Sequence, residues 1–387
     1  MLSNESVAWY TFDYDMTLAY VIFNNFQLNL DAYGCSENKH FAIKNDYQIR
    51  SAYFLISGSF ILTLYVICLI AIIKIEHMTK LPAYKTMLFL GFCDTCATFI
   101  HSFATGIFGL FGIAFCDYPL LIFILGSIGL GSWMGCCITS ILLAFIRVCD
   151  VDSQSKLKKM FDGWRIYVLL AICGVYFFVA TFLTKPVVFN PMSWFFDPNV
   201  GKDVGFLIVE TRSVRQIWRI CRIYHCRTPQ RFDNTILTKT IDFFPRNLPS
   251  IYISTIHYFN NFSVIICTVL FYGYIAYVYL KESRSIASKQ LSKSQISVIL
   301  LQSFFFCFFH VITAIAYIAM EFLSASDFLT LLGLLGWQWS SGSVCIVYLT
   351  LNKTIRQAVK KLLCSNVSNS VGLATFGKLK FSENKLW

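Results

Sequence analysis

The sequence predicts an all-α membrane protein, a bundle of seven transmembrane helices with the N-terminus outside and a short amphipathic helix after the seventh span. Composition is the first reason. Of the 387 residues, 56% are hydrophobic and only 14% are charged, whereas soluble domains carry about 25% charged residues. The second reason is the number of charge-free windows, and the third is the distribution of lysine and arginine between the loops.

Seven windows are nearly free of charge and long enough to cross a bilayer, which takes about 20 apolar residues. One charge-free run extends from Pro119 to Ile146 and corresponds to about 42 Å of helix. Only one acidic residue, Asp94, interrupts any of these windows. The expected spans are 51–73, 84–111, 119–147, 165–184, 252–280, 295–321 and 328–352.

Lysine and arginine indicate the orientation, because cytosolic loops of membrane proteins are enriched in both. With the N-terminus outside, 19 of the 32 basic residues fall in the three inner loops and the tail. Ten more lie between the fourth and fifth spans, where the rule loses force because the loop exceeds about 60 residues. We therefore expect an extracellular segment at 1–50, a bundle at 51–352, and a cytoplasmic amphipathic helix with a disordered tail at 353–387.

The net charge of +11 follows mostly from this topology and also favours contact with anionic inner-leaflet lipid. We expect no nucleic-acid partner, because no basic soluble domain is present to bind one. Residues 208–250 are unusual for an outer loop, since arginines recur there at three- to five-residue spacing. We interpret this stretch as an insertion in the second extracellular loop, and the aromatic run Trp194–Pro198 before it as a lid over the bundle.

Cysteines outside the spans indicate a disulfide, because exported loops meet an oxidising compartment. Spacing alone does not choose the partner of Cys116. No Cys/His group has convincing metal-ligand spacing, so we predict neither a metal nor a cofactor. The candidates for the bridge are Cys35, Cys116, Cys221 and Cys226, with Asn4 as a glycosylation site and Cys364 as a lipidation site.

Polar and aromatic residues recur at a similar depth in several spans, mostly in the outer half. Each alone is more often a packing residue or an interhelical hydrogen bond. Together they are suited to a cavity for a small organic ligand, because such sites combine aromatic walls with a few polar groups. The candidates are His101, Trp133, Asn260, Asn261, Gln302, His310, Trp337 and Gln338.

Two charged residues are candidates for switching and coupling. Asp94 lies about 15 Å into the second span, where a carboxyl group is costly and is by default a functional candidate. The alternative is a structural hydrogen-bond hub. Arg147 ends the third span, where a receptor would contact a G protein, and the alternative is an ordinary positive-inside anchor.

Several short motifs, in order, resemble the nematode serpentine receptors of class T, over roughly residues 35–363. They include Ala83–Met87 with Asp94, Phe115-Cys116 with Tyr118-Pro119, Gly131–Gly135, Leu143-Ala144 with Arg147, Thr184–Pro186, Trp194–Pro198, Asn260-Asn261, Gln302-Ser303 with His310, and Tyr348–Asn352 with Ile355-Arg356. The resemblance implies a G-protein-coupled chemosensory receptor in the plasma membrane of sensory neurons or their cilia. Its implied partners are a small-molecule ligand, a heterotrimeric G protein and membrane lipid.

The chain departs from the pattern of this family at two places. Ile146 stands where the family commonly has Asn before the arginine, and residues 208–250 have no counterpart. The resemblance therefore favours Cys35 over the cysteines of that stretch as the partner of Cys116. The stretch is interpreted as an insertion or as untranslated sequence, and a transcript encoding all of it would exclude the second interpretation.

The residues favour a receptor over other classes of membrane protein. A secondary transporter would show internal repeats and charged residues at the midplane, and a channel would show a polar pore helix or filter. Transporter or channel remains the alternative, while an enzyme is not expected because no catalytic constellation is present. The candidate cavity residues favour a neutral or weakly polar ligand.

Overall fold

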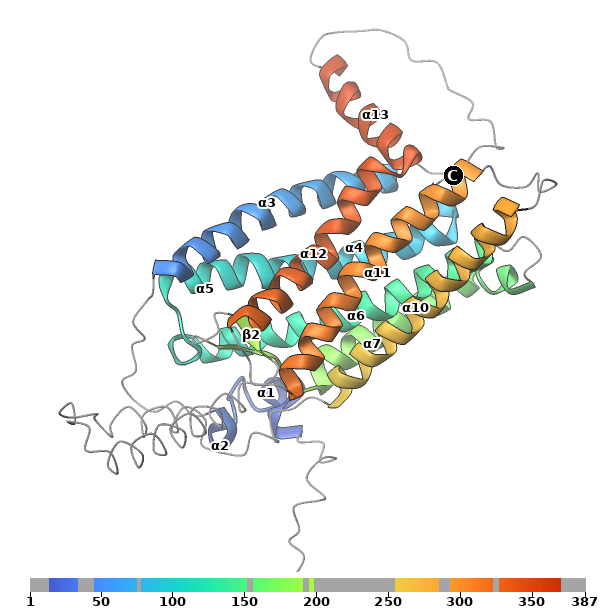
Figure 1. Ribbon diagram of the computed structural model, residues 1–387. Helices are drawn as coiled ribbons and strands as arrows, with labels where there is room; N and C mark the ends of the chain where they lie inside the picture. The colour runs from blue at the N-terminus through green and yellow to red at the C-terminus, as the bar shows by residue number, and fades with distance from the viewer. Residues whose placement is uncertain are drawn as a thin grey trace, which may run out of the picture.

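The computed structural model describes residues 14–33, 45–74, 78–151, 156–190, 195–197, 255–284, 293–322 and 327–369. Within these ranges it forms a bundle of seven long helical segments, each coinciding with one predicted span (Figure 1). The segments are α3 (Asn45–Lys74), α4 (Pro82–Thr98) continued through the π-helix η4 (Phe99–Ala104) into α5 (Thr105–Phe111), α6 (Pro119–Val151), α7 (Arg165–Leu183), α10 (Thr255–Arg284), α11 (Lys293–Phe322) and α12 (Asp327–Thr350).

Five of the described helical segments are long and apolar enough to cross a membrane, the first five of the bundle. In α11 the described side chains include an apolar stretch from Phe308 to Met320. Helix α12 instead carries many buried polar residues, including Gln338, Ser340, Ser341 and Ser343, and it packs along α11. A helix that turns polar groups toward the bundle has less apolar surface for lipid.

Helix α6 is the central helix of the bundle. Its apolar window is 72% buried, compared with 28% for α7 and 22% for α10. Proline supplies its first residue, as it does for α4, because the fixed φ of proline suits the first helical position and its missing N–H is not needed there. Gly131 and Gly135 lie against α7, and a Cβ at Gly131 would come within 1.9 Å of the Thr181 hydroxyl oxygen. The backbones of α6 and α7 therefore approach each other closely at these glycines.

One end of the bundle is covered by two short pieces of chain (Figure 1). The hairpin of β1 (Val188–Asn190) and β2 (Phe195–Asp197) pairs antiparallel, with Phe189 opposite Phe196, and Phe189 is fully buried. The N-terminal helices α1 (Leu18–Phe23) and α2 (Leu30–Tyr33) lie at the same end, with the ring centroid of Tyr33 packed 5.1 Å from that of Phe123. Strand β2 thus lies within Trp194–Pro198, the aromatic run that we expected to form a lid. The N-terminal helices add a cover that the sequence did not predict.

Helix α13 (Lys353–Asn369) extends from the opposite end of the bundle (Figure 1). It begins after Asn352, whose Oδ1 accepts hydrogen bonds from the backbone N–H groups of Thr354 and Ile355, both at 3.1 Å, as an N-cap does. Ile355 and Val359 are buried, because the helix packs against α3 and α12 with this part of its apolar face. Leu363 on the same helix is exposed.

Several predictions fall outside the described part of the chain. These are Asn4, Cys35, the stretch 208–250 and the tail after residue 369, together with the side chain of Cys364. Cys116 is disulfide-bonded, in agreement with the expectation that it forms a bridge. Its favoured partner, Cys35, lies outside the described residues.

Candidate functional site

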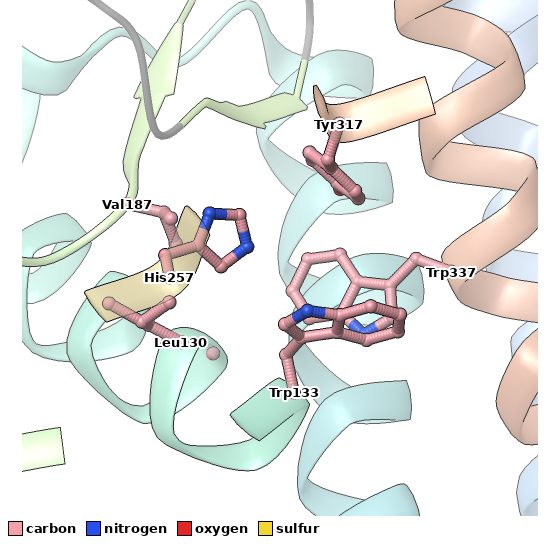
Figure 2. Close-up of a pocket in the computed structure, with 7 residues that line it drawn as sticks. Leu130, Trp133, Val187, His257, Tyr317 and Trp337 are labelled. Atoms are coloured by element: carbon pink, nitrogen blue, oxygen red, sulfur yellow. The ribbon is translucent and has the colours of Figure 1, made fainter. Parts of the chain in front are cut away.

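A small cavity lies between α6, α10, α11, α12 and the residue before β1. Its walls are Gly129, Leu130, Trp133, Val187, His257, Tyr317 and Trp337, and the free volume between them is about 10 Å³, room for about one water molecule. Figure 2 shows the two indoles of Trp133 and Trp337 side by side on one wall, with His257 and Tyr317 above them. This volume is far below the about 300–1,000 Å³ of sites that hold drug-sized ligands. A small organic molecule would therefore enter the cavity only if some of the lining side chains moved aside.

Trp133 is the centre of a group of aromatic rings around this cavity. Its ring centroid lies 6.0 Å from that of His310 in a stacked arrangement, 6.2 Å from Tyr317 and 6.3 Å from Trp337. His101 meets Trp337 edge-on at 5.3 Å. Rings at these separations attract one another beyond the burial of their area, so they hold each other in place from four different helical segments.

A hydrogen-bond chain fixes the polar groups next to Trp133. Its indole Nε1–H donates to Oδ1 of Asn261 at 2.9 Å, which leaves the amide nitrogen of Asn261 as a donor. That nitrogen lies 3.3 Å from Nε2 of His257, so Nε2 accepts and a neutral His257 carries its proton on Nδ1. Asn261 and His257, four positions apart on one face of α10, thereby form a hydrogen-bond chain that begins at Trp133.

Replacing Trp133 by Phe is expected to lower the melting temperature of the purified receptor. The change removes the indole N–H and leaves the buried Asn261 oxygen without its donor, at a cost of about 1–3 kcal/mol. Thermal denaturation in detergent measures the effect. The control is Trp164→Phe, which removes an indole that is 71% exposed. Equal melting temperatures for the two variants would contradict the structural role of the Trp133 bond.

The remaining candidate residues take different positions. Asn260 accepts a hydrogen bond from the hydroxyl of Tyr176 at 3.1 Å. Gln338 bonds to serines on α3 and η4, beside the cavity wall rather than in it. Gln302 lies eight residues before His310 on α11, about 12 Å along the helix axis. All of them are buried, but only Trp133 and Trp337 of the eight candidates line the cavity.

Three lining residues outside α6 were missed by the sequence reasoning. His257 and Asn261 are spaced to share a helix face, and Tyr317 follows His310 by two helical turns, so periodicity offered a signal for both His257 and Tyr317. Val187 comes from the chain between α7 and β1, where no periodicity exists. Only the folding of that segment over the bundle places Val187 at the cavity.

A family model described as "Serpentine type 7TM GPCR chemoreceptor Srt" matches residues 16–371. The chain belongs to this family. It is a multi-pass membrane receptor of the G-protein-coupled type and not an enzyme, which confirms the expected family and seven-helix fold.

A curated Srt relative is Serpentine receptor class T-55 of Caenorhabditis elegans. It is 23% identical over 295 residues, which cover 76% of this chain and 68% of the relative. Among solved structures, squid rhodopsin matches with a TM-score of 0.49 and 13% identity, over 87% of this chain and 91% of that one. The likeness to rhodopsin is too distant to support any argument about ligand or mechanism.

Asp94 of this Srt receptor lies at a junction of four helices. The hydroxyl of Tyr65 on α3 donates to its Oδ2, and the thiol of Cys136 on α6 donates to its Oδ1 at 3.1 Å. Ser341 on α12 adds a further side-chain hydrogen bond. Asp94 is 1% exposed. This geometry is that of a hydrogen-bond hub, and whether the hub also switches stays a prediction.

Arg147 lies near the end of α6 that is opposite the cavity, and it is mostly buried. It is close enough to Asp150 and Tyr348 for electrostatic interaction. Ile146 beside it is also buried and belongs to the apolar core of this end. An arginine that serves only as a topology anchor would extend into the headgroup region, whereas Arg147 is buried. Its role in coupling stays a prediction.

Proposed function

We propose that this Srt receptor binds a small, neutral or weakly polar molecule in the cavity between Trp133 and Trp337 and signals to a heterotrimeric G protein at the opposite end. The observation that carries the proposal is the cavity itself. Four aromatic side chains line it, from four helices, so a bound molecule would touch several helices at once. If these helices move relative to one another, such a ligand contacts the two conformations differently and can shift the receptor between them.

The walls of the cavity favour an uncharged ligand. Among its seven lining residues, none is Asp, Glu, Lys or Arg, and burying an unpaired charge is expensive. Aromatic rings, by contrast, supply a large apolar contact area for a small organic molecule. These properties support a neutral or weakly polar ligand and do not identify it further.

The opposite end supports contact with a cytosolic partner. With the N-terminus outside, Arg147 faces the cytosol together with the lysine-rich segment η6 (Lys156–Met160) and helix α13. A basic surface at the inner leaflet attracts both anionic lipid and acidic protein surfaces. In the family context we place the receptor in the plasma membrane of sensory neurons or their cilia.

The test is ligand-evoked G-protein activation by the full-length receptor in a heterologous cell, screened with uncharged odorant-sized compounds. Arg147→Ala is expected to abolish activation while the surface level of the receptor is maintained. Arg165→Ala is the matched control, because Arg165 is exposed and bonds the Lys159 carbonyl at 2.8 Å at the surface. Uptake of a labelled solute without any second-messenger response would contradict the proposal and favour the transporter alternative.

A further inference from the structure

We propose that the ligand carries an uncharged oxygen acceptor, such as a ketone or aldehyde carbonyl, which accepts a hydrogen bond from the indole Nε1–H of Trp337. This inference rests on the proposed function, since it names the ligand class of the same cavity. It depends on a different observation, the hydrogen-bonding state of the tryptophans and of the polar groups beside them.

Among the residues that the structure describes, the indole N–H of Trp337 is buried without a hydrogen-bond partner, and the side chain is only 4% exposed. The two nearby tryptophans differ in this respect. Trp133 donates to Asn261 at 2.9 Å, and Trp339 donates to the hydroxyl of Tyr53 at 3.1 Å. A buried donor without an acceptor costs about 1–3 kcal/mol, and native structures rarely keep one without a reason. A ligand oxygen in the adjoining cavity would satisfy it.

The indole of Trp337 is held in one position. A Cβ built on Gly129 would lie 3.5 Å from Cη2 of Trp337, so the absence of a side chain there leaves room for the ring. His101 and Trp133 contact the same indole edge-on, at 5.3 and 6.3 Å between centroids. A donor on a fixed ring presents a defined direction to a ligand, and preorganised groups bind at a lower entropic cost.

The polar chain next to Trp337 also presents a donor. Ser57 donates to the Tyr53 carbonyl at 2.6 Å, so it must accept from Gln338 Nε2, 2.8 Å away. The same nitrogen donates to Ser102 at 2.9 Å. Among the contacts described for Ser102, this leaves Nδ1 of His101, at 2.8 Å, to accept the serine proton. A neutral His101 then carries its own proton on Nε2, which is buried and has no partner within the described chain.

The unpartnered groups near the cavity favour this class of ligand. Within the described ranges, the nitrogens Nε1 of Trp337, Nε2 of His101 and Nδ2 of Asn260 are donors without acceptors, and Oε1 of Gln338 is an acceptor without a donor. Of these four residues only Trp337 belongs to the cavity wall, where His257 and Tyr317 are the other polar side chains. A molecule with one acceptor oxygen and an otherwise apolar body matches this wall, whereas a carboxylate would lack a cation among the lining residues to neutralise it.

The experiment compares matched probes on the full-length receptor in nanodiscs. The probes are the 2-ketones from butan-2-one to octan-2-one, each paired with the 2-methyl-1-alkene that has a CH₂ group in place of the carbonyl oxygen. Indole ¹⁵N–¹H spectra report the eight tryptophans separately, and Trp337→Phe identifies the Trp337 signal. Ketones are expected to move that signal downfield, and the alkenes are not.

Affinity gives the second readout. Trp337→Phe keeps an aromatic ring but removes the donor, so ketone affinity is expected to fall about two- to tenfold, the worth of one neutral hydrogen bond, with alkene affinity unchanged. Trp339→Phe is the control, since it removes an N–H that is already bonded within the protein. It should leave the ketone preference intact.

Three results would overturn the proposal. One is equal affinity of wild-type receptor for ketone and alkene, and another is a ketone preference that survives Trp337→Phe. The third is binding by no member of either series. The proposed receptor function is measured separately, as basal G-protein activation that depends on Arg147. Failure of the ligand class and failure of the receptor function are therefore distinguishable.

Discussion

Gly131→Leu is expected to stop the bundle from folding, because α6 and α7 touch at this residue. A Cβ there would lie 1.9 Å from Oγ1 of Thr181 and 3.1 Å from the backbone oxygen of Phe177. The hydroxyl of Thr181 is held by its own bond to that oxygen at 2.9 Å, so it cannot turn away without a further cost. Overpacking typically costs about 1–3 kcal/mol, and a leucine against a backbone atom falls at the upper end or above. Surface expression and melting temperature in detergent measure the loss.

Two glycines provide matched controls for this substitution. At Gly273 on α10 no heavy atom of the described chain lies within 4 Å of an added Cβ, and at Gly174 on α7 the nearest is a Phe89 ring carbon at 4.0 Å. Leucine at either position should leave expression close to wild type. Gly131→Ala should lower expression less than Gly131→Leu. Combining Gly131→Ala with Thr181→Ala should partly restore expression, because the second change removes the nearest atom. Equal expression of the leucine variants at positions 131 and 273 would disprove the close helix contact.

Asp94→Leu is expected to have the second largest effect on stability. Leucine has the same branching and number of side-chain heavy atoms as aspartate but accepts no hydrogen bond, so the hydroxyl of Tyr65, which is fully buried, would lose its acceptor, as would Cys136. Each unsatisfied group costs about 1–3 kcal/mol. We expect the total loss of free energy of unfolding to reach about 3 kcal/mol, measured by denaturation in detergent.

A double-mutant cycle separates the lost hydrogen bond from other effects of the leucine. Tyr65→Phe removes the donor and leaves the ring, so the combined variant Asp94→Leu with Tyr65→Phe should be less destabilised than the sum of the two single changes. Additive losses would show that the bond between these residues contributes little. Asp94→Asn, which retains an acceptor oxygen, should remain closer to wild type than Asp94→Leu.

The architecture was accessible from the sequence because it depends on local composition. Each charge-free window became a helix, and Pro119 begins α6 where predicted, since proline at a first helical position has a purely local cause. The shared depth of Trp133 and Trp337 was likewise sufficient to place both at one cavity. Depth follows from counting residues along a helix of constant rise, and that count does not require knowledge of the neighbouring helices.

Other features required the packed bundle. One of them is the π-helix around His101. It adds a residue to one helical turn and so changes the direction in which the later side chains of this span point. No residue type in this stretch predicts it. Depth was misjudged for Gln302, which lies about four turns along α11 from Tyr317, the residue of that helix that lines the cavity. Helix α13 shows that an amphipathic face does not reveal its partner, since the end of a bundle and a lipid surface are both apolar.

By itself, the sequence determined the membrane class, the seven helices, the family motifs and the set of buried polar residues from which a site had to be built. The tertiary structure alone decided which of those residues meet. It brought Val187 and His257 to Trp133 and Trp337, and within the described chain it left the Trp337 indole without an acceptor while Trp133 found one in Asn261. Helix formation depends on residues close in the chain, whereas a cavity depends on the rotation and tilt of helices that are distant in sequence.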